Sequence, residues 1–361
     1  MTTAASFQIE YLKFLDPQGK VVSPLPAFAQ DPAVLTTLYK AMVLMRTYDA
    51  KAIALQRTGQ LGTYASMLGK EAVEAGIGAA MAPDDVFLCT YRENGVQIMR
   101  GVTMQELFLY WGGDERGSDF AGPRRDFPVC ITIASQCLHA TGVAYAMKLR
   151  KQKRAAVCMI GDGATSKGDF YESINAAGTW QLPVIFFITN NQWAISVPRK
   201  TQSAAQTLAQ KAIAAGIEGL QVDGNDVVAV HHAMREALAK AHEGRGPTVI
   251  EAITYRLADH TTADDASRYR PPEEVAEAWK REPILRLRHY LSEAGAWNKT
   301  NEEDLLKQCN EQVQAAAQAY IDTPPPPLEQ MFDHLYATLP AAYLAQRSAV
   351  LESGHGPDHP R

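Results

Sequence analysis

The segment AAVCMIGDGATSKGDF, residues 155–170, joins an apolar run to an aspartate that stands between two glycines. Six consecutive apolar residues bounded by Arg154 and Gly161 are typical of a buried β-strand. Similar runs recur at residues 86–90, 183–189, 219–222 and 247–255, and helical periodicity occurs at 31–56, 69–81, 169–179, 207–215 and 227–243. Short apolar strands that alternate with helices predict an α/β fold, with a parallel sheet covered by helices.

The pattern changes on either side of this region. Residues 1–30 show no clear periodicity and contain Pro24 and Pro26, which mark turns, so we expect an irregular arm there. From Pro271 onward the strand-like runs stop while helical periodicity continues. We therefore predict three parts: an N-terminal arm at residues 1–30, an α/β domain at 31–270 and a C-terminal helical extension at 271–361.

Composition narrows the class of function. A chain of 361 residues with 46% hydrophobic and 21% charged residues is typical of a folded globular protein. The net charge of −5 gives no reason to expect a nucleic-acid partner, and no apolar stretch approaches the roughly 20 residues that span a bilayer. The N-terminal residues lack a signal or transit pattern, and the five cysteines lack metal-binding spacing. We expect buried thiols and a cytoplasmic protein.

Two polar residues follow neighbouring strands of the predicted sheet. Asp162 comes just after one strand, and Asn191 just after the next. Because ligands bind beyond the carboxyl ends of strands in an open parallel sheet, both side chains are expected to reach one site. Mg²⁺ accepts carboxylate and amide oxygens and completes its coordination with phosphate oxygens and water. Gly161 and Gly163 would let the backbone approach such phosphates, so we predict a Mg²⁺-diphosphate site.

Two other interpretations of the GDG motif remain open at this point. An isolated Gly-Asp-Gly can be a plain turn from strand to helix, with Asp162 capping the helix. A nicotinamide site is less well supported, because the run offers only Gly161, Gly163 and Gly168 and lacks the G-x-G-x-x-G spacing.

The pairing of GDG with the later NN is more specific than either motif alone. The 26 residues from Ala164 to Thr189 separate the two motifs, and this spacing resembles the signature of thiamine-diphosphate enzymes. The segments GDGATSKGDFYESINAAG, NNQWAISVP, QVDGNDVVAV and HTTADDASRYRP resemble the alpha subunit of the decarboxylating first component of 2-oxoacid dehydrogenase complexes. The resemblance covers about residues 35–347. It implies a thiamine-diphosphate-binding α/β fold with helical N- and C-terminal extensions.

The resemblance also implies roles for individual residues. Mg²⁺ would be bound by Asp162, Asn191 and the main-chain carbonyl of Trp193, a position at which the family often has tyrosine. Asn190, the first residue of the NN pair, is expected to make structural hydrogen bonds. The implied thiamine diphosphate contacts are Tyr91, Arg92, Ile131, Ile133, Gly161, Asp162, Gly163, Ala164, Asn191, Trp193 and His260.

The segment YRLADHTTADDASRYR, residues 255–270, resembles the family's active-site loop. We expect a mobile segment that becomes ordered around the cofactor. The resemblance assigns the catalytic role to His260, because an imidazole can donate a hydrogen bond near the reacting centre. Asp259 replaces the residues usual in the family, which leaves its role open. Thr261 stands where mitochondrial relatives have a regulatory serine, and we interpret it as an ordinary loop hydroxyl.

The implied activity is the oxidative decarboxylation of a small 2-oxoacid, with acyl transfer to the lipoyl group of an acyltransferase component. Pyruvate is the favoured substrate, a branched-chain 2-oxoacid is the alternative, and acetoin cleavage comes third. A one- or two-methylene difference is worth only about 1–3 kcal/mol, so the sequence pattern does not decide between substrates. Alternatives of another class are a non-catalytic paralogue that binds the complex and a nicotinamide-dependent dehydrogenase.

A second polypeptide is implied as well. The family needs a glutamate that contacts the aminopyrimidine ring of the cofactor, and this residue belongs to a beta subunit in an α₂β₂ assembly. No second α/β pattern follows Pro271. Glu71, in LGKEAVEAG, is the nearest internal candidate, but we expect it on the surface of a helix. His231 and His232 match no motif and are expected to be structural.

Overall fold

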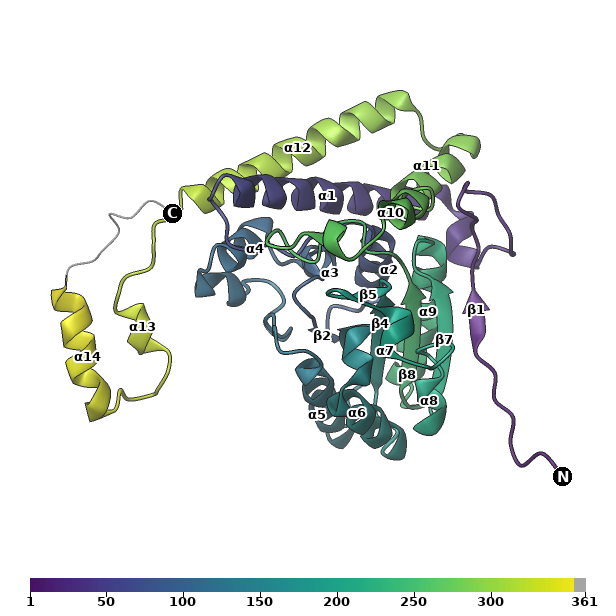
Figure 1. The fold of residues 1–361 in the computed structure, drawn as a ribbon, viewed down its shortest axis with the longest axis horizontal. Coiled ribbons are helices and arrows are strands. Elements are labelled where there is room, and N and C mark those ends of the chain that lie inside the picture. Colours follow the sequence, from purple (N-terminus) through teal and green to yellow (C-terminus); the bar gives the residue numbers. More distant parts are fainter. Residues whose placement is uncertain (354–361) are drawn as a thin grey trace.

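The computed structural model describes residues 1–353; residues 354–361, the end of the predicted helical extension, lie outside the described residues. Its centre is a six-stranded sheet in the order β1-β7-β8-β4-β3-β2, in which every pairing is parallel (Figure 1). The strands are β1 (Glu10–Leu12), β2 (Val86–Leu88), β3 (Ala156–Gly161), β4 (Val184–Asn190), β7 (Glu218–Asp223) and β8 (Thr248–Ile253). The predicted α/β class is confirmed.

Side chains of the central strands alternate between two apolar cores, as the period of two along a strand requires. Val157, Met159 and Phe187 face a core built with helices α1 (Pro32–Arg57), α2 (Glu71–Ala80) and α9 (Val227–His242). Cys158, Ile160 and Phe186 face the opposite core, which α5 (Ser135–Leu149) and α6 (Gly168–Thr179) cover. Burial on both faces explains why these strands read as continuous apolar runs.

The remaining elements surround this sandwich. They are η1 (Ala27–Gln30), α3 (Asn94–Arg100), α4 (Met104–Trp111), η2 (Glu115–Ser118), η3 (Gly163–Ser166), the pair β5 (Trp193–Ala194) and β6 (Val197–Pro198), α7 (Arg199–Gln202), α8 (Lys211–Ala214) and η4 (Ala266–Arg268). None of the helices in the described part of the chain is long and apolar enough to cross a membrane.

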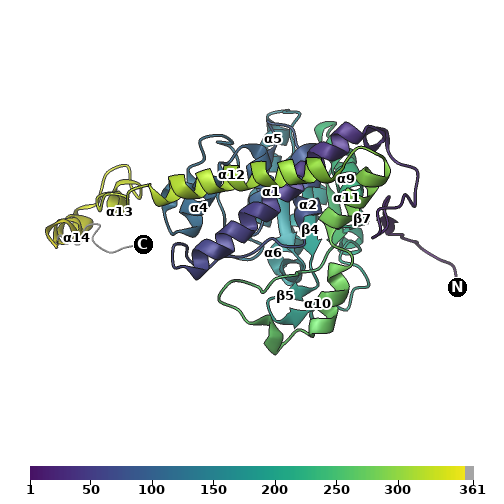
Figure 2. The same ribbon diagram turned by 90° about the horizontal axis from the view of Figure 1, so that it is seen from above.

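The predicted C-terminal extension is helical throughout its described part. It contains α10 (Pro272–Trp279), α11 (Pro283–Glu293), α12 (Lys299–Ile321), α13 (Gln330–Asp333) and α14 (Ala341–Glu352). Helix α12 lies beside α1 in both ribbon views, and its Leu305 and Tyr320 belong to the same core as α1 (Figures 1 and 2). Helices α13 and α14 project away from the body in both views.

The N-terminal arm is not irregular throughout, which corrects the sequence-based expectation. Strand β1 pairs with β7 at the edge of the sheet. The buried Asp226 then fixes the chain that follows, because its Oδ2 accepts hydrogen bonds from the backbone N–H groups of Phe14 (2.7 Å) and Leu15 (2.8 Å). The strand was not recognised because it is three residues long and mostly exposed.

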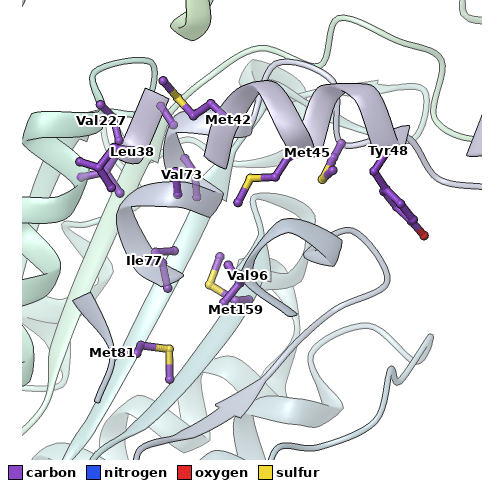
Figure 3. Packing of buried hydrophobic residues seen from close by; sticks show 14 of the residues in the cluster. Leu38, Met42, Met45, Tyr48, Val73, Ile77, Met81, Val96, Met159 and Val227 are labelled. Atoms are coloured by element: carbon purple, nitrogen blue, oxygen red, sulfur yellow. The ribbon is translucent and has the colours of Figure 1, made fainter. Parts of the chain in front are cut away.

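Helix α2 lies in the middle of the larger core, between α1, α3 and α9. Figure 3 shows its Val73 on the side of α1 that carries Leu38 and Met42, with Ile77 one turn farther from α1, and all four belong to this core. Glycines permit this close packing: a Cβ atom built on Gly76 would lie 2.6 Å from Cγ1 of Val230 in α9. Close approach of the two helices therefore depends on the missing side chain.

Gly76→Ala should lower the free energy of unfolding by about 1–3 kcal/mol, because the added methyl group overpacks the contact between α2 and α9. Gly142→Ala in α5 is the matched control. Gly142 is exposed, and its Cβ would meet no described atom within 4 Å, so the helix propensity of alanine should raise stability by about 0.5–1 kcal/mol. Chemical denaturation of the two variants measures both effects, and equal stabilities would contradict the packing argument.

Candidate active site

A cavity of about 270 Å³ opens at the carboxyl ends of β3 and β4. It is lined by nearly all of the residues that the sequence resemblance assigned to the cofactor: Tyr91, Arg92, Ile133, Gly161, Asp162, Gly163, Ala164, Asn191, Trp193 and His260. Ile131 is absent from the described lining, and its side chain is 59% exposed. The fold thus collects residues from five separate parts of the sequence at one place.

Asp162 is buried at this edge of the sheet, and its carboxylate is only partly compensated by neighbouring groups. Its side chain makes no capping hydrogen bond to the following helix, so capping does not account for this buried carboxylate. Within the described part of the chain its Oδ2 has no hydrogen-bond partner. Burial raises the pKa of Asp162 from 3.8 to about 6, although the positive charges of Arg256 and Arg199 oppose this shift. An unpaired buried carboxylate oxygen is suited to bind a cation.

Asn190 and Asn191 have different surroundings. The Asn190 amide donates to Oε1 of Glu251 (2.7 Å), which agrees with the expected structural role. The chain then turns sharply through Gln192 and Ile195, whose φ angles are 73° and 55°. In this turn Oδ1 of Asn191 accepts from the backbone N–H of Trp193 (3.2 Å). Asn191 and Trp193 both line the cavity together with Asp162.

The two glycines of the GDG motif serve different purposes. A Cβ atom on Gly161 would meet no other described atom within 4 Å, so this backbone borders open space in the cavity. A Cβ atom on Gly163 would lie 2.9 Å from Cβ of Ala194, so packing against β5 also requires glycine here. Together with the orphaned Asp162 oxygen, the open space at Gly161 fits a metal-bound diphosphate group.

Arg92 and His260 also line the cavity and contact each other. The Arg92 guanidinium is buried and donates to the carbonyl of Ser66 and to the carbonyl of His260 (2.8 Å). Its Nη2 also lies 3.2 Å from Nδ1 of His260. Arginine only donates, so Nδ1 must accept and the neutral ring carries its proton on Nε2. Burial, together with the charges of Arg92 and Arg256, lowers the pKa of His260 to about 4.

The loop around His260 has its own hydrogen bonds. The backbone N–H of His260 donates to Oδ2 of Asp264 (2.9 Å), and Thr262 exchanges two hydrogen bonds with Tyr64. Asp259, whose role was open, accepts from the backbone N–H of Ala266 (3.0 Å). Oγ1 of Thr261 accepts from Ala263 within the same turn (3.3 Å). These contacts define one folded conformation of the loop, and its mobility stays a prediction.

Sequence reasoning missed several polar residues at or beside the cavity, among them Lys70, Gln136 and Arg256. Lys70 and Gln136 line it, and both are buried. Arg256 is also buried, and its Nε and Nη1 have no partner among residues 1–353. Gln136 directly follows the ITIAS segment, so its position in the sequence could have indicated that it lies at the cavity. No sequence pattern indicates that Lys70 or Arg256 lies at the cavity, because nothing local distinguishes a buried cation from an exposed one.

Glu71 requires a correction. It is fully buried rather than on a helix surface, and it pairs with Arg46 (2.8 Å). It is not among the described lining residues of the cavity, so it does not take the part of the missing glutamate. His231 is structural, as expected: its Nδ1 lies 3.0 Å from the carbonyl of Gly76, and its ring packs against Phe28.

Asp162→Asn should stabilise the metal-free protein at pH 7. The folded-state pKa of Asp162 is raised, so the stability from its proton is complete below about pH 3.8 and is lost as the pH rises through about 6. Removing the ionised carboxylate should therefore add about 1–3 kcal/mol at neutral pH. The same variant should lose the thermal stabilisation that Mg²⁺ with inorganic diphosphate gives the parent.

Asp226→Asn is the matched control, because the Asp226 carboxylate is equally buried but accepts several backbone hydrogen bonds. An amide nitrogen cannot accept them, so this variant should be destabilised. Thermal denaturation with and without Mg²⁺ and diphosphate measures both variants. A destabilised Asp162→Asn that still responds to Mg²⁺ would overturn the cation-site assignment.

His260 should remain neutral, with its proton on Nε2, down to about pH 5. Its folded-state pKa lies below the usual 6.5, so its contribution to stability is present above pH 6.5 and lost as the pH falls towards 4. Histidine-selective ¹⁵N spectra, assigned with a His260→Asn variant, report both tautomer and pKa. Arg92→Met should move the pKa upward, and an unchanged pKa would contradict the role given to Arg92.

Comparisons with known proteins agree with this geometry. A family model described as dehydrogenase E1 component matches residues 39–329. The chain is 41% identical over 329 residues to a pyruvate dehydrogenase E1 component subunit alpha of Acholeplasma laidlawii, covering 90% of this chain and 94% of the relative. The Mycoplasma pneumoniae protein of the same name is 39% identical, covering 90% of both chains.

A relative with a different name has similar coverage. The 3-methyl-2-oxobutanoate dehydrogenase subunit alpha of Mycobacterium tuberculosis is 37% identical over 346 residues, covering 96% of this chain and 94% of the relative. The match to the family model extends over most of the chain and includes every residue that lines the cavity. This chain belongs to the dehydrogenase E1 component family.

Proposed function

We propose that this chain is the alpha subunit of the E1 component of a 2-oxoacid dehydrogenase, with pyruvate as its substrate. Its reaction is oxidative decarboxylation, in which carbon dioxide leaves and the remaining acyl group passes to a lipoyl disulfide, which is reduced. The observation that carries the proposal is the buried Asp162 carboxylate with an unpartnered oxygen in the cavity that it shares with Asn191 and Trp193. The names of the pyruvate dehydrogenase relatives support the choice of substrate.

The dehydrogenase E1 component family depends on thiamine diphosphate. Mg²⁺ would be held by Asp162, Asn191 and the carbonyl of Trp193, and the diphosphate would lie along Gly161, Gly163 and Ala164. Among the described residues no group of three His, Cys, Asp or Glu side chains forms a metal site. A cation here would therefore depend on amide, carbonyl and phosphate oxygens, which Mg²⁺ favours. When bound, thiamine diphosphate supplies the nucleophile and the electron sink that decarboxylation of a 2-oxoacid requires.

Other residues that line the cavity would orient the reacting groups. Arg92 provides a buried positive charge that favours a bound diphosphate or carboxylate. Neutral His260 would donate from Nε2 to an oxygen of the substrate or of the acyl group. Tyr91 packs edge-on against the His260 ring, with the centroids 6.0 Å apart, and holds the imidazole in place. Ile133 contributes an apolar surface at the mouth of the cavity, and Ile131 stays a predicted backbone contact.

The proposal includes two protein partners. A beta subunit would contribute the glutamate for the aminopyrimidine ring and complete the site in an α₂β₂ assembly. An acyltransferase component would present the lipoyl group. The names of the relatives, each an alpha subunit, support the first partner. We also propose a cytoplasmic location, on the sequence grounds given above.

A branched-chain 2-oxoacid is the second candidate substrate. The observation that favours it is the 37% identity to the 3-methyl-2-oxobutanoate dehydrogenase subunit alpha, which extends over 96% of this chain. A non-catalytic paralogue is a weaker alternative, because Asp162, Asn191, Arg92 and His260 are all present and share one cavity.

The test is to purify the chain with and without its beta subunit and to assay decarboxylation with thiamine diphosphate and Mg²⁺. We expect turnover only from the assembled pair, and a higher kcat/KM for pyruvate than for 3-methyl-2-oxobutanoate. His260→Ala should lower acyl transfer at least about 10-fold while changing cofactor affinity less, because a positioned proton donor contributes mainly to the reacting state. Full activity of the isolated chain would overturn the shared site, and a preference for the branched substrate would select the alternative.

A further inference from the structure

A buried cluster of three charged residues lies in the wall of the cavity, apart from the residues with assigned roles. Nζ of Lys70 lies 2.6 Å from Oε1 of Glu93 and 3.1 Å from Oε1 of Glu74. The three side chains are at most 3% exposed. Lys70 and Glu93 line the cavity, while Glu74 lies behind them in α2. Two carboxylates thus share one buried ammonium group, which makes their geometry strongly dependent on Lys70.

Glu93 closes the turn that presents Tyr91 and Arg92 to the cavity. Its Oε2 accepts hydrogen bonds from the backbone N–H (2.7 Å) and from Oγ1 (2.5 Å) of Thr90. Its Oε1 accepts from Lys70. The Glu93 carboxylate therefore stabilises the turn and connects it to Lys70 at the start of α2.

Two hydrogen bonds connect Arg92 to the segment 66–70, and Arg92 accepts one of them and donates the other. Nζ of Lys70 donates to the main-chain carbonyl of Arg92 (3.4 Å). The Arg92 guanidinium donates in turn to the carbonyl of Ser66. One contact fixes the backbone of Arg92 and the other its side chain, so the position of the guanidinium depends on both.

Packing behind the cluster leaves little room for adjustment. Oε2 of Glu74 accepts from the backbone N–H of Val96 at the start of α3 (3.0 Å). A Cβ atom on Gly95 would lie 2.7 Å from Cβ of Glu74, so α2 and α3 are in close contact here. Lys70 therefore lies between the closely packed helices α2 and α3 and the turn that contains Arg92.

We propose that Lys70 is a positioning residue, which sets the location of the Arg92 guanidinium and neutralises Glu93 where the cavity receives an anionic group. The proposal rests on the proposed function, since the anion is the diphosphate of thiamine diphosphate. Without Lys70 the turn loses its attachment to α2. The Glu93 carboxylate would then face the cavity uncompensated and repel phosphate oxygens.

Two variants separate positioning from stability. Lys70→Gln leaves Glu93 charged and buried, and should both lower the melting temperature and weaken binding of thiamine diphosphate with Mg²⁺ at least about 10-fold. The double variant Lys70→Gln/Glu93→Gln removes both charges. It should recover part of the melting temperature, since Glu74 stays buried without its cation, but not the affinity, because the hydrogen bond from Lys70 to the carbonyl of Arg92 is still missing.

Arg100→Gln is the matched control. Arg100 is an equally buried cation, paired with Asp126 at 2.5 Å, but it lies outside the described lining of the cavity. Its loss should lower the melting temperature without changing cofactor affinity. Affinities are measured by calorimetry on the assembled alpha–beta complex, with thiamine diphosphate and with inorganic diphosphate as separate probes.

A second readout does not require the cofactor. Because Arg92 holds the pKa of His260 low, displacement of its guanidinium in Lys70→Gln should raise that pKa in ¹⁵N spectra. An affinity and a His260 pKa equal to those of the parent would overturn the proposal, as would recovery of both by the double variant. If the parent binds no thiamine diphosphate, the proposed function fails, and the His260 pKa alone then decides whether Lys70 positions Arg92.

Discussion

The parallel register of the three central strands is the constraint on which the site depends. Gly161 of β3 pairs with Thr189 of β4, and Asn190 of β4 pairs with Ile253 of β8. The chain therefore leaves all three strands at nearly the same level, which brings Asp162, Asn191 and the start of the His260 loop to one edge. A shift of one residue in either pairing would turn the buried side chains to the opposite core, so the two apolar cores enforce the register.

Within this frame the site is built from charges that the fold buries without fully pairing them. Asp162 has an unpartnered oxygen and Arg256 has unpartnered N–H groups in the described part of the chain, while the guanidinium of Arg92 donates to the carbonyls of Ser66 and His260. Such groups oppose folding, and proteins usually keep them only where a ligand compensates. The large cores on both sides of the sheet supply the stability that lets these groups persist.

Sequence reasoning predicted the parts of the structure that carry local signals. The central strands are buried on both faces and therefore appear as apolar runs. Strand β1 and helix α5 were missed: β1 is a three-residue edge, and exposed apolar residues of α5 such as Leu138 and Leu149 blur its periodicity. Asp162 and Asn191 both line one cavity because strand ends of a parallel sheet converge, while their binding role stays a prediction. The links from Lys70 to Glu93 and from Arg92 to Ser66 depend on packing between distant segments, which no local pattern encodes.

The edge strand β1 also bears on how the chain acquires its structure during synthesis. Glu10 pairs with Leu220, so the partner of the first strand is synthesised about two hundred residues after it. The sequence separation between helix α1 and α12, which completes the core around α1, is longer still. Both elements carry apolar side chains that remain uncovered meanwhile, and long-range pairings of this kind slow folding. The pairings of β1 with β7 and of α1 with α12 therefore form late in synthesis, and a nascent chain that stalls before residue 220 would expose β1 and one face of α1 to chaperones.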